Sequence, residues 1–126
     1  ASDVYKRQTL QSVSCSDTKL PYAFEVEIRR LNGWAYLYVN GNELALAEQT
    51  NMDRVIPSSW LRPGINTVKV EYGDWGPFCD GSYAEINILV DGSATPAGKK
   101  TMNWWSCGYS WEWEINTNNG SVVFKR

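Results

Sequence analysis

The chain has 126 residues, of which 43% are hydrophobic and 21% are charged, and its formal net charge is −2. This length suits one domain with a single core, and the charge gives no reason to expect binding to nucleic acid or to an anionic membrane. Histidine is absent from the sequence, which excludes a Ser-His-Asp triad and the commonest zinc sites. No apolar run approaches the length of about 18 residues that a membrane-spanning helix requires.

The first eight residues are polar and show no regular period. Within them, Asp3–Gln8 is similar to the translation of a transposon end that is used to prepare sequencing libraries. We therefore expect residues 1–8 to be a non-native or disordered tail on a metagenomic gene fragment. Residues 9–126 are expected to form one β-sandwich domain.

Two strands are predicted early in the chain. Residues 23–30 alternate between apolar and polar side chains, which is typical of a half-buried antiparallel strand. Residues 34–39 form a strand that is apolar on both faces, with Ala35, Leu37 and Val39 on one and Trp34, Tyr36 and Tyr38 on the other. The intervening Leu31-Asn32-Gly33 predicts a hairpin between the two strands.

Turn sequences punctuate the middle of the chain. Asn40-Gly41-Asn42 predicts a tight turn, and residues 43–48 fit either a short strand or a helical turn. Residues 53–57 are short and β-like. A second turn at residues 61–64 leads into an alternating strand over residues 66–72, whose inward side chains are Val68, Val70 and Tyr72.

The last third is predicted to contain four strands. Residues 83–90 alternate with Ala84, Ile86, Ile88 and Val90 towards the core, and residues 91–98 form a loop. Residues 100–106 and 109–116 are expected to pair as a hairpin around Cys107-Gly108. A turn at residues 116–120 precedes a closing strand over residues 121–125. About nine short strands in all predict an all-β, antiparallel β-sandwich.

One stretch carries a family resemblance. Its parts are Tyr36–Gly41, then Val55-Ile56-Pro57, then Trp60–Val70, and Asn66 is expected to tie its side chain to the turn at Pro63-Gly64. This stretch resembles the galactose-binding-like jelly-roll family, which includes many carbohydrate-binding modules. The resemblance implies a jelly-roll sandwich and a sugar-binding role.

The aromatic content favours recognition, because seven Trp and seven Tyr stand against three Phe. The first candidate site is the outward row of Trp34, Tyr36 and Tyr38, whose ring faces can stack on the C–H patches of sugars. Outward polar groups of the preceding strand, Glu25, Glu27 and Arg29, are expected to lie nearby. Alternatively, a loop, the N-terminal arm or a partner domain covers the row.

Two further groups are candidates. In the last third, Trp111, Trp113 and Ile115 should be core, which leaves Asn103, Trp105 and Tyr109 for a ligand. The Gly-rich loop over residues 73–81 offers Trp75 with Asp74 and Asp80 for stacking and hydrogen bonding. The same acids with Asp91 could hold Ca²⁺, although no EF-hand spacing is present, so we expect no cofactor and leave a Ca²⁺ ion open.

Cysteine and carboxylate positions leave two questions open. Cys79 and Cys107 could form a disulfide in an oxidising compartment. Cys15 would then be free, or could pair instead with either one. Glu112 and Glu114, or Glu25 and Glu27, have a spacing that a glycosidase could use. Alternating acids are also the normal outer surface of a half-buried strand, and we expect a protein that is not an enzyme.

These observations favour a non-catalytic carbohydrate-binding module that stacks exposed aromatics on a plant or microbial β-glycan. We expect a monomer, secreted as part of a larger glycan-degrading enzyme, with a polysaccharide and neighbouring domains as its partners and no nucleic-acid or membrane contact. The alternative is a structural or adhesive β-sandwich, such as a filament, cell-surface or accessory domain, in which the aromatic face is a protein interface.

Overall fold

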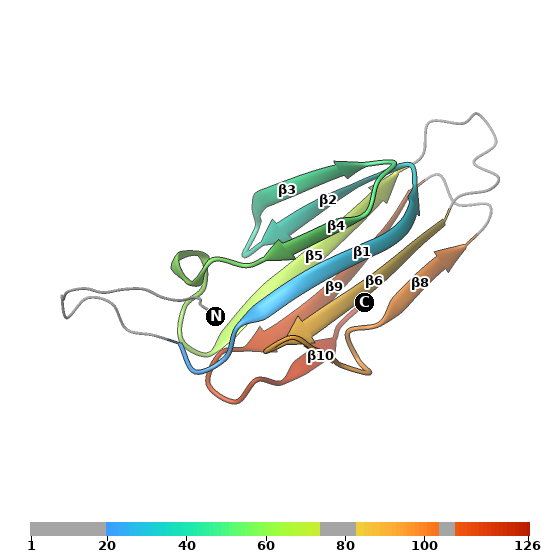
Figure 1. The fold of residues 1–126 in the computed structure, drawn as a ribbon. Helices are drawn as coiled ribbons and strands as arrows, with labels where there is room; N and C mark the ends of the chain where they lie inside the picture. The colour runs from blue at the N-terminus through green and yellow to red at the C-terminus, as the bar shows by residue number, and fades with distance from the viewer. Residues whose placement is uncertain (1–19, 74–82, 104–107) are drawn as a thin grey trace.

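The computed structural model describes residues 20–73, 83–103 and 108–126. In this part of the chain, ten strands form two antiparallel sheets of five strands each, packed face to face (Figure 1). The predicted all-β sandwich is confirmed, with ten strands against about nine expected. A single 3-10 turn, η1 (Ser58–Trp60), is the only helical element among these residues.

The first sheet, called the β1 sheet, has the order β4-β1-β6-β7, and β8 pairs with β6 as well. Its strands are β1 (Phe24–Asn32), β4 (Met52–Val55), β6 (Tyr83–Val90), β7 (Ser93–Ala94) and β8 (Lys100–Asn103). The second, called the β2 sheet, has the order β10-β9-β5-β2-β3. Its strands are β2 (Trp34–Val39), β3 (Asn42–Glu48), β5 (Ile65–Gly73), β9 (Gly108–Asn116) and β10 (Val122–Phe124).

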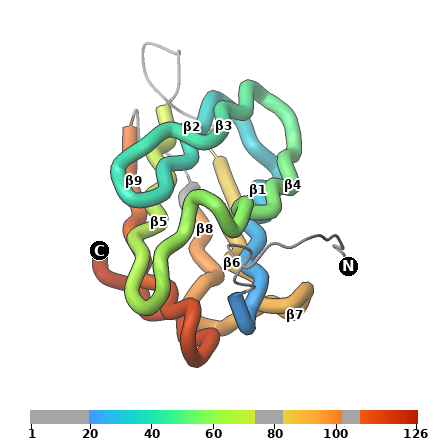
Figure 2. Tube along the Cα trace, turned by 90° about the vertical axis from the view of Figure 1, so that its left-hand side faces the viewer, coloured from blue at the N-terminus to red at the C-terminus, as the bar shows by residue number. Residues whose placement is uncertain are grey.

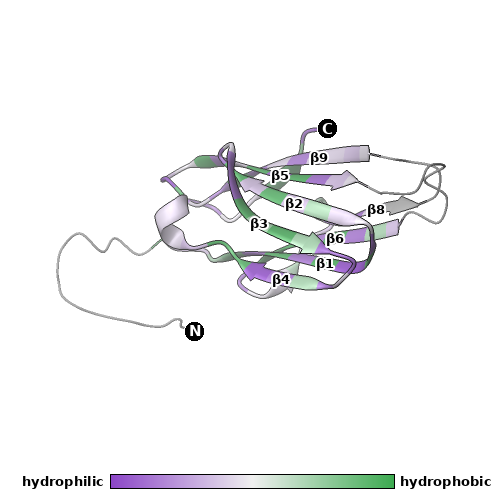
Figure 3. Cartoon of the chain, turned by 90° about the horizontal axis from the view of Figure 1, so that it is seen from above, coloured by the Kyte–Doolittle hydropathy of each residue, from purple (hydrophilic) through white to green (hydrophobic). Residues whose placement is uncertain are grey.

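Figure 3 shows the two sheets as two layers seen from above. The core lies between them, where apolar side chains from both sheets form one buried cluster. Every long strand contributes alternate residues to it, as the sequence pattern predicts. The largest fully buried side chain is Trp113, whose indole nitrogen donates to the Ala97 carbonyl oxygen over 3.0 Å. Trp111 and Ile115 are also buried, which confirms the prediction that Trp111, Trp113 and Ile115 belong to the core.

The predicted hairpin between residues 23–30 and 34–39 is wrong. β1 pairs with β4 and β6, whereas β2 pairs with β3 and β5, so the two consecutive strands lie in opposite sheets (Figure 2). Arg30 has a φ of 56° and Gly33 one of 119°, and the β1–β6 register shifts between Arg29 and Asn32. These features carry the chain from one layer to the other instead of folding it back.

The predicted hairpin around Cys107-Gly108 is also wrong. β8 pairs with β6 in the β1 sheet, and β9 pairs with β5 along nine positions of the β2 sheet. A β5–β9 pair can align two largely apolar inner faces over nine residues, whereas β8 has only four residues to offer a partner. β9 therefore pairs with β5, which is distant in the sequence, rather than with the preceding strand β8.

The turns around β2 and β5 match the sequence predictions. Asn40 and Gly41 have φ angles of 50° and 83°, as a tight two-residue hairpin requires, and residues 42–48 form a strand, not a helical turn. Asn66 is completely buried, and its side-chain amide donates to the Arg62 and Gly64 carbonyl oxygens over 2.8 and 3.1 Å. The predicted tie between Asn66 and the Pro63-Gly64 turn is confirmed.

Candidate functional site

The outer face of β2 carries three aromatic rings in a row. Trp34, Tyr36 and Tyr38 alternate with buried residues and are themselves half-buried, so all three point away from the core. The Trp34 and Tyr36 ring centres lie 5.5 Å apart at 72°, and those of Tyr36 and Tyr38 lie 6.1 Å apart at 29°. The rings therefore support one another, which accounts for part of their burial.

The Trp34 indole lies over the backbone of β5. Trp34 pairs with Gly73, and a Cβ added at Gly73 would overlap Cζ2 and Cη2 of the indole and lie 2.6 Å from Cε2. Such a short distance to three successive ring atoms places a ring face, not an edge, above the glycine. Gly73 in turn pairs with Gly108 on β9, where an added Cβ would meet only ordinary contacts at 3.6 Å. Gly73 thus lies beneath the indole, and its partner Gly108 on the next strand also has no side chain.

Neighbouring strands frame the row with charged and apolar side chains. On β3, the residues opposite the three rings are Glu48, Leu46 and Glu43. On β5, Glu71 lies opposite Tyr36 and Lys69 opposite Tyr38. We call the surface formed by these eight side chains the aromatic face; it consists of Trp34, Tyr36, Tyr38, Glu43, Leu46, Glu48, Lys69 and Glu71.

A small polar network fixes one end of the aromatic face. The Lys69 ammonium lies 3.1 Å from Glu71 Oε2 and 5.9 Å from the centre of the Tyr38 ring. Desolvation raises the pKa of Tyr38, and so do the charge of Glu71, a hydrogen bond from the Tyr38 hydroxyl to Glu71, and the charge of Glu43. Tyr38 therefore stays a neutral hydrogen-bond donor at physiological pH, with its ring held by two neighbours.

No family model, curated protein or solved structure matches this chain. Its candidate function therefore depends on the site geometry alone. Within residues 20–73, 83–103 and 108–126, no three His, Cys, Asp or Glu side chains gather as a metal site would require. No helix in the same residues is long and apolar enough to cross a membrane.

Tyr109 lies on a different surface from the aromatic face. It pairs with Tyr72, which is buried, so it occupies the inner-facing side of β9 at the end of the sandwich, where it is 54% exposed. Its ring packs edge-on against Trp111 at 5.0 Å between centres. Tyr109 is therefore separated from the β2 row by the thickness of the β2 sheet.

Several predicted site residues lie outside the described part of the chain. These are Trp75, Asp80, Trp105, and the proposed disulfide partners Cys79 and Cys107. Asn103 ends β8 and pairs in register with Tyr83. Gly73 pairs with Gly108, so the strand ends that flank both segments lie at one end of the sandwich. The roles assigned to these residues remain predictions.

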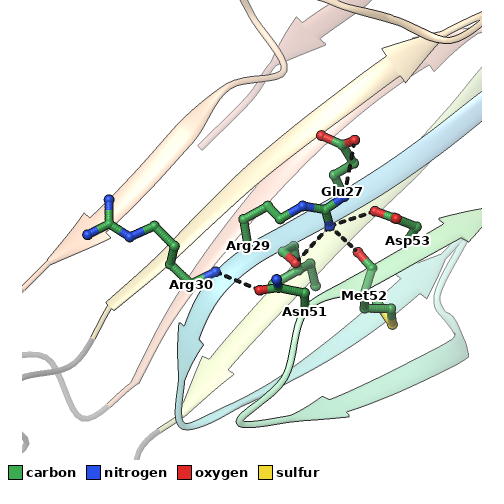
Figure 4. Close-up of polar contacts among 7 residues, drawn as sticks. Glu27, Arg29, Arg30, Asn51, Met52 and Asp53 are labelled. Atoms are coloured by element: carbon green, nitrogen blue, oxygen red, sulfur yellow. Dashed lines mark hydrogen bonds and ion pairs between the residues drawn. The ribbon is translucent and has the colours of Figure 1, made fainter.

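The polar groups Glu25, Glu27 and Arg29 do not lie near the aromatic face, because β1 belongs to the other sheet. Arg29 instead binds the edge strand β4, with Nη1 2.6 Å from Asp53 Oδ1 and 3.3 Å from the Met52 carbonyl oxygen (Figure 4). Its Nη2 also lies 3.4 Å from Glu27. This cluster fastens β4 to β1 and forms part of the opposite surface of the molecule.

Three other acids considered from the sequence, Glu112, Glu114 and Asp91, have structural partners. Glu112 Oε1 lies 3.0 Å from Arg126 Nη2, and Glu114 Oε1 lies 3.9 Å from Lys125 Nζ. Asp91 accepts a hydrogen bond from the Ala23 backbone N–H over 2.9 Å. The two glutamates thus have the cross-strand ion pairs typical of a strand surface.

Sequence reasoning missed six residues of the site: Gly73, Glu43, Leu46, Glu48, Lys69 and Glu71. Each lies next to β2 only through the β2–β3 and β2–β5 pairings. Strand alternation shows which way a side chain points but not which strand lies beside it. For Leu46, the sole sequence signal was an apolar residue on the side of its strand opposite to Ala45 and Ala47.

Proposed function

We propose that the protein is a non-catalytic carbohydrate-binding module that holds a glycan chain on the aromatic face. The observation that supports this best is the Trp34 indole lying face-on over Gly73, on an outer sheet face. An aromatic ring parallel to a surface can stack on the C–H patch of a pyranose ring. Dispersion and release of water from the ring would supply most of the affinity.

The polar members of the aromatic face would bind sugar hydroxyls. Glu71 offers carboxylate oxygens, Lys69 offers ammonium donors, and the Tyr36 hydroxyl can donate or accept. Side chains on the same face of a strand recur at about 7 Å, so the three residues follow β2 at a spacing on the scale of sugar units. Trp34 would stack on one ring, whereas Tyr36, inclined at 72° to Trp34, would offer its ring edge and its hydroxyl. Because the rings contact one another already, little side-chain freedom is lost on binding.

The same proposal includes a parent enzyme and a ligand class. A small sandwich with an exposed row of aromatic rings suits a domain of a secreted, multidomain glycan-degrading enzyme, where it would keep the enzyme on its polymer. The ligand class that we propose is a plant or microbial β-glycan, since extended β-linked chains present the flat ring faces that an aromatic row can follow.

Affinity gel electrophoresis against a panel of soluble β-glucans, xylans and mannans tests the proposal. We expect at least one glycan to retard the wild-type protein, and Trp34→Ala and Tyr36→Ala to remove most of that retardation. Tyr83→Ala is the matched control, because Tyr83 lies on the outer surface of the β1 sheet. Retardation by no glycan would refute the proposal, as would equal loss in the control.

A second candidate function is a structural or adhesive domain that uses the aromatic face as a protein interface. Leu46, opposite Tyr36, is 43% exposed and extends the apolar surface onto the edge strand β3. Size-exclusion chromatography with light scattering distinguishes the two functions. A stable oligomer that Leu46→Glu dissociates would favour the interface, and a monomer at high concentration would favour the glycan site.

A further inference from the structure

We propose that the aromatic face selects glycans without anionic groups and rejects uronate-rich or sulfated chains. This inference rests on the proposed carbohydrate-binding function and specifies its ligand class. It follows from the charges that surround the three rings, which belong to β3 and β5.

The charge balance of the aromatic face is negative. Three carboxylates border the rings, from Glu43, Glu48 and Glu71, whereas Lys69 is the one cation among the eight side chains of the face. Lys69 is already paired with Glu71 at 3.1 Å. The remaining Glu43 and Glu48 are both exposed, so a bound chain would lie within a field that two carboxylates create.

Two further described cations at this sheet, Lys125 and Arg126, lie beside acids of β9. On β9, the next strand outward from β5, Glu112 lies opposite Lys69 and its carboxylate is bound by Arg126 at 3.0 Å. Lys125 approaches Glu114 at 3.9 Å. These two pairs are locally neutral, so they add no net positive charge beside the rings.

Glu43 and Glu48 lie where a bound glycan chain would meet their carboxylates. Glu48 pairs with Trp34 and Glu43 with Tyr38, so one carboxylate borders each end of the ring row. A neutral pyranose can accept this arrangement, because its hydroxyls donate hydrogen bonds to carboxylates. A uronate or sulfate group at the same place would be repelled by these carboxylates. The one cation of the face, Lys69, is already paired with Glu71.

A matched pair of polymers tests this inference. The neutral glycan that retards the wild-type protein is compared with its carboxymethylated derivative at low ionic strength, with mobility normalised to a gel without glycan. Repulsion between one glutamate and one polymer carboxylate at the strand spacing of about 4.8 Å in water predicts about fourfold weaker binding to the charged polymer. The difference should shrink as salt approaches physiological strength, where the screening length is about 8 Å.

Charge variants then connect the effect to the two glutamates. The double variant Glu43→Gln/Glu48→Gln should reduce the ratio between the two polymers at least twofold. The matched control Glu25→Gln/Glu85→Gln removes the same charge from the outer surface of the β1 sheet and should leave the ratio unchanged. Equal effects of both double variants would overturn the inference, since net charge alone would then explain it.

The outcomes separate this inference from the proposed function. Equal or stronger retardation by the carboxymethylated polymer, or by polygalacturonate or alginate, would overturn the charge selection while leaving glycan binding intact. Retardation by no polymer of either kind would refute glycan binding itself, and the inference with it. Self-association through the face would appear as an oligomer in light scattering and would also overturn it.

Discussion

The Asn40 side chain donates a hydrogen bond to Asn66 Oδ1 over 2.8 Å and thereby joins two turns that are 26 residues apart. Asn66 Oδ1 also accepts from the Arg62 backbone N–H at 2.9 Å, and Asn40 Oδ1 accepts from the Thr67 N–H at 2.8 Å. The tip of the β2–β3 hairpin and the entry to β5 are therefore one hydrogen-bonded unit. This unit sets the register of the strands that carry the aromatic face.

Replacement of Asn66 by alanine should destabilise the protein severely. The substitution removes the four hydrogen bonds that the buried Asn66 amide makes with the Asn40 side chain, the Arg62 N–H and the carbonyl oxygens of Arg62 and Gly64. Because one hydrogen bond contributes about 0.5–1.5 kcal/mol net, we expect a total loss of about 3 kcal/mol. Urea unfolding followed by far-UV circular dichroism measures it. The control Asn42→Ala, at an exposed position of β3, should change the free energy of unfolding by less than about 0.5 kcal/mol. Similar losses in both variants would contradict the network.

Local features of this fold could be predicted from the sequence, whereas strand partners could not. The Asn40-Gly41 turn and the Asn66 tie were predictable because they depend on neighbours within a few residues. The pairings of β1 with β6 and of β9 with β5 join strands that are far apart in the chain. Both predicted hairpins failed for this reason, because alternation reveals an inner face but not the sheet that contains it.

A methyl group at Gly73 should lift the Trp34 indole from the sheet. An added Cβ overlaps the ring, so Gly73→Ala forces the indole to move, while Gly108→Ala, at the paired position on β9, meets only a contact at 3.6 Å. We expect Gly73→Ala to change the near-UV circular dichroism and to weaken glycan retardation at least fivefold. Gly108→Ala should preserve both signals.

The comparison of Gly73→Ala with Gly108→Ala distinguishes an effect of the Trp34 position on binding from a general loss of stability. If Gly73→Ala lost retardation while its near-UV spectrum stayed at the wild-type form, the face-on position of Trp34 would not explain binding. Unfolding curves of both variants check that each remains folded at the assay temperature. Comparable weakening of retardation in the two variants would also contradict the prediction.

The hydroxyl of Tyr38 should titrate later than that of an ordinary tyrosine. Desolvation and Glu71 raise its pKa above the usual value of about 10 in the folded protein. Because the folded state then holds the proton more tightly than the unfolded state, Tyr38 stabilises the fold below pH 10. This contribution is lost as the pH rises through the folded pKa.

An NMR titration of ring-labelled tyrosine measures the pKa of Tyr38 and of other tyrosines. Tyr83, whose hydroxyl donates to Glu85 over 2.7 Å, also has a raised pKa, chiefly because of that hydrogen bond. Glu71→Gln should lower the pKa of Tyr38 and leave that of Tyr83 in place, and Glu85→Gln should do the reverse. A Tyr38 resonance that titrates identically in wild type and Glu71→Gln would rule out the assigned cause.

The candidate site was only partly accessible to sequence reasoning. Alternation on β2 correctly predicted that Trp34, Tyr36 and Tyr38 point outward. The charges that frame them come from β3 and β5, and the polar residues expected nearby, such as Arg29, lie on the opposite surface. Side-chain direction is a local property of a strand, but the neighbours of a ring depend on sheet order.

Removal of the Arg29 side chain should loosen the edge strand β4. Arg29 holds Asp53 at 2.6 Å and the Met52 carbonyl oxygen at 3.3 Å, and β4 otherwise pairs with β1 alone. Partly exposed ion pairs of this kind contribute about 0.2–1 kcal/mol, so Arg29→Ala should accelerate amide exchange in β4 up to about fivefold. Hydrogen exchange followed by NMR measures this rate residue by residue.

Arg30→Ala provides the matched control for this last experiment. It removes the same charge one residue further on, but the Arg30 side chain pairs with Glu85 of β6 at 3.3 Å, whereas only its backbone N–H contacts Asn51 (Figure 4). Its variant should leave exchange in β4 close to the wild-type rate. If both variants accelerated β4 equally, loss of positive charge would explain the effect. If only Arg29→Ala did so, the contacts to Asp53 and Met52 hold the edge strand against β1.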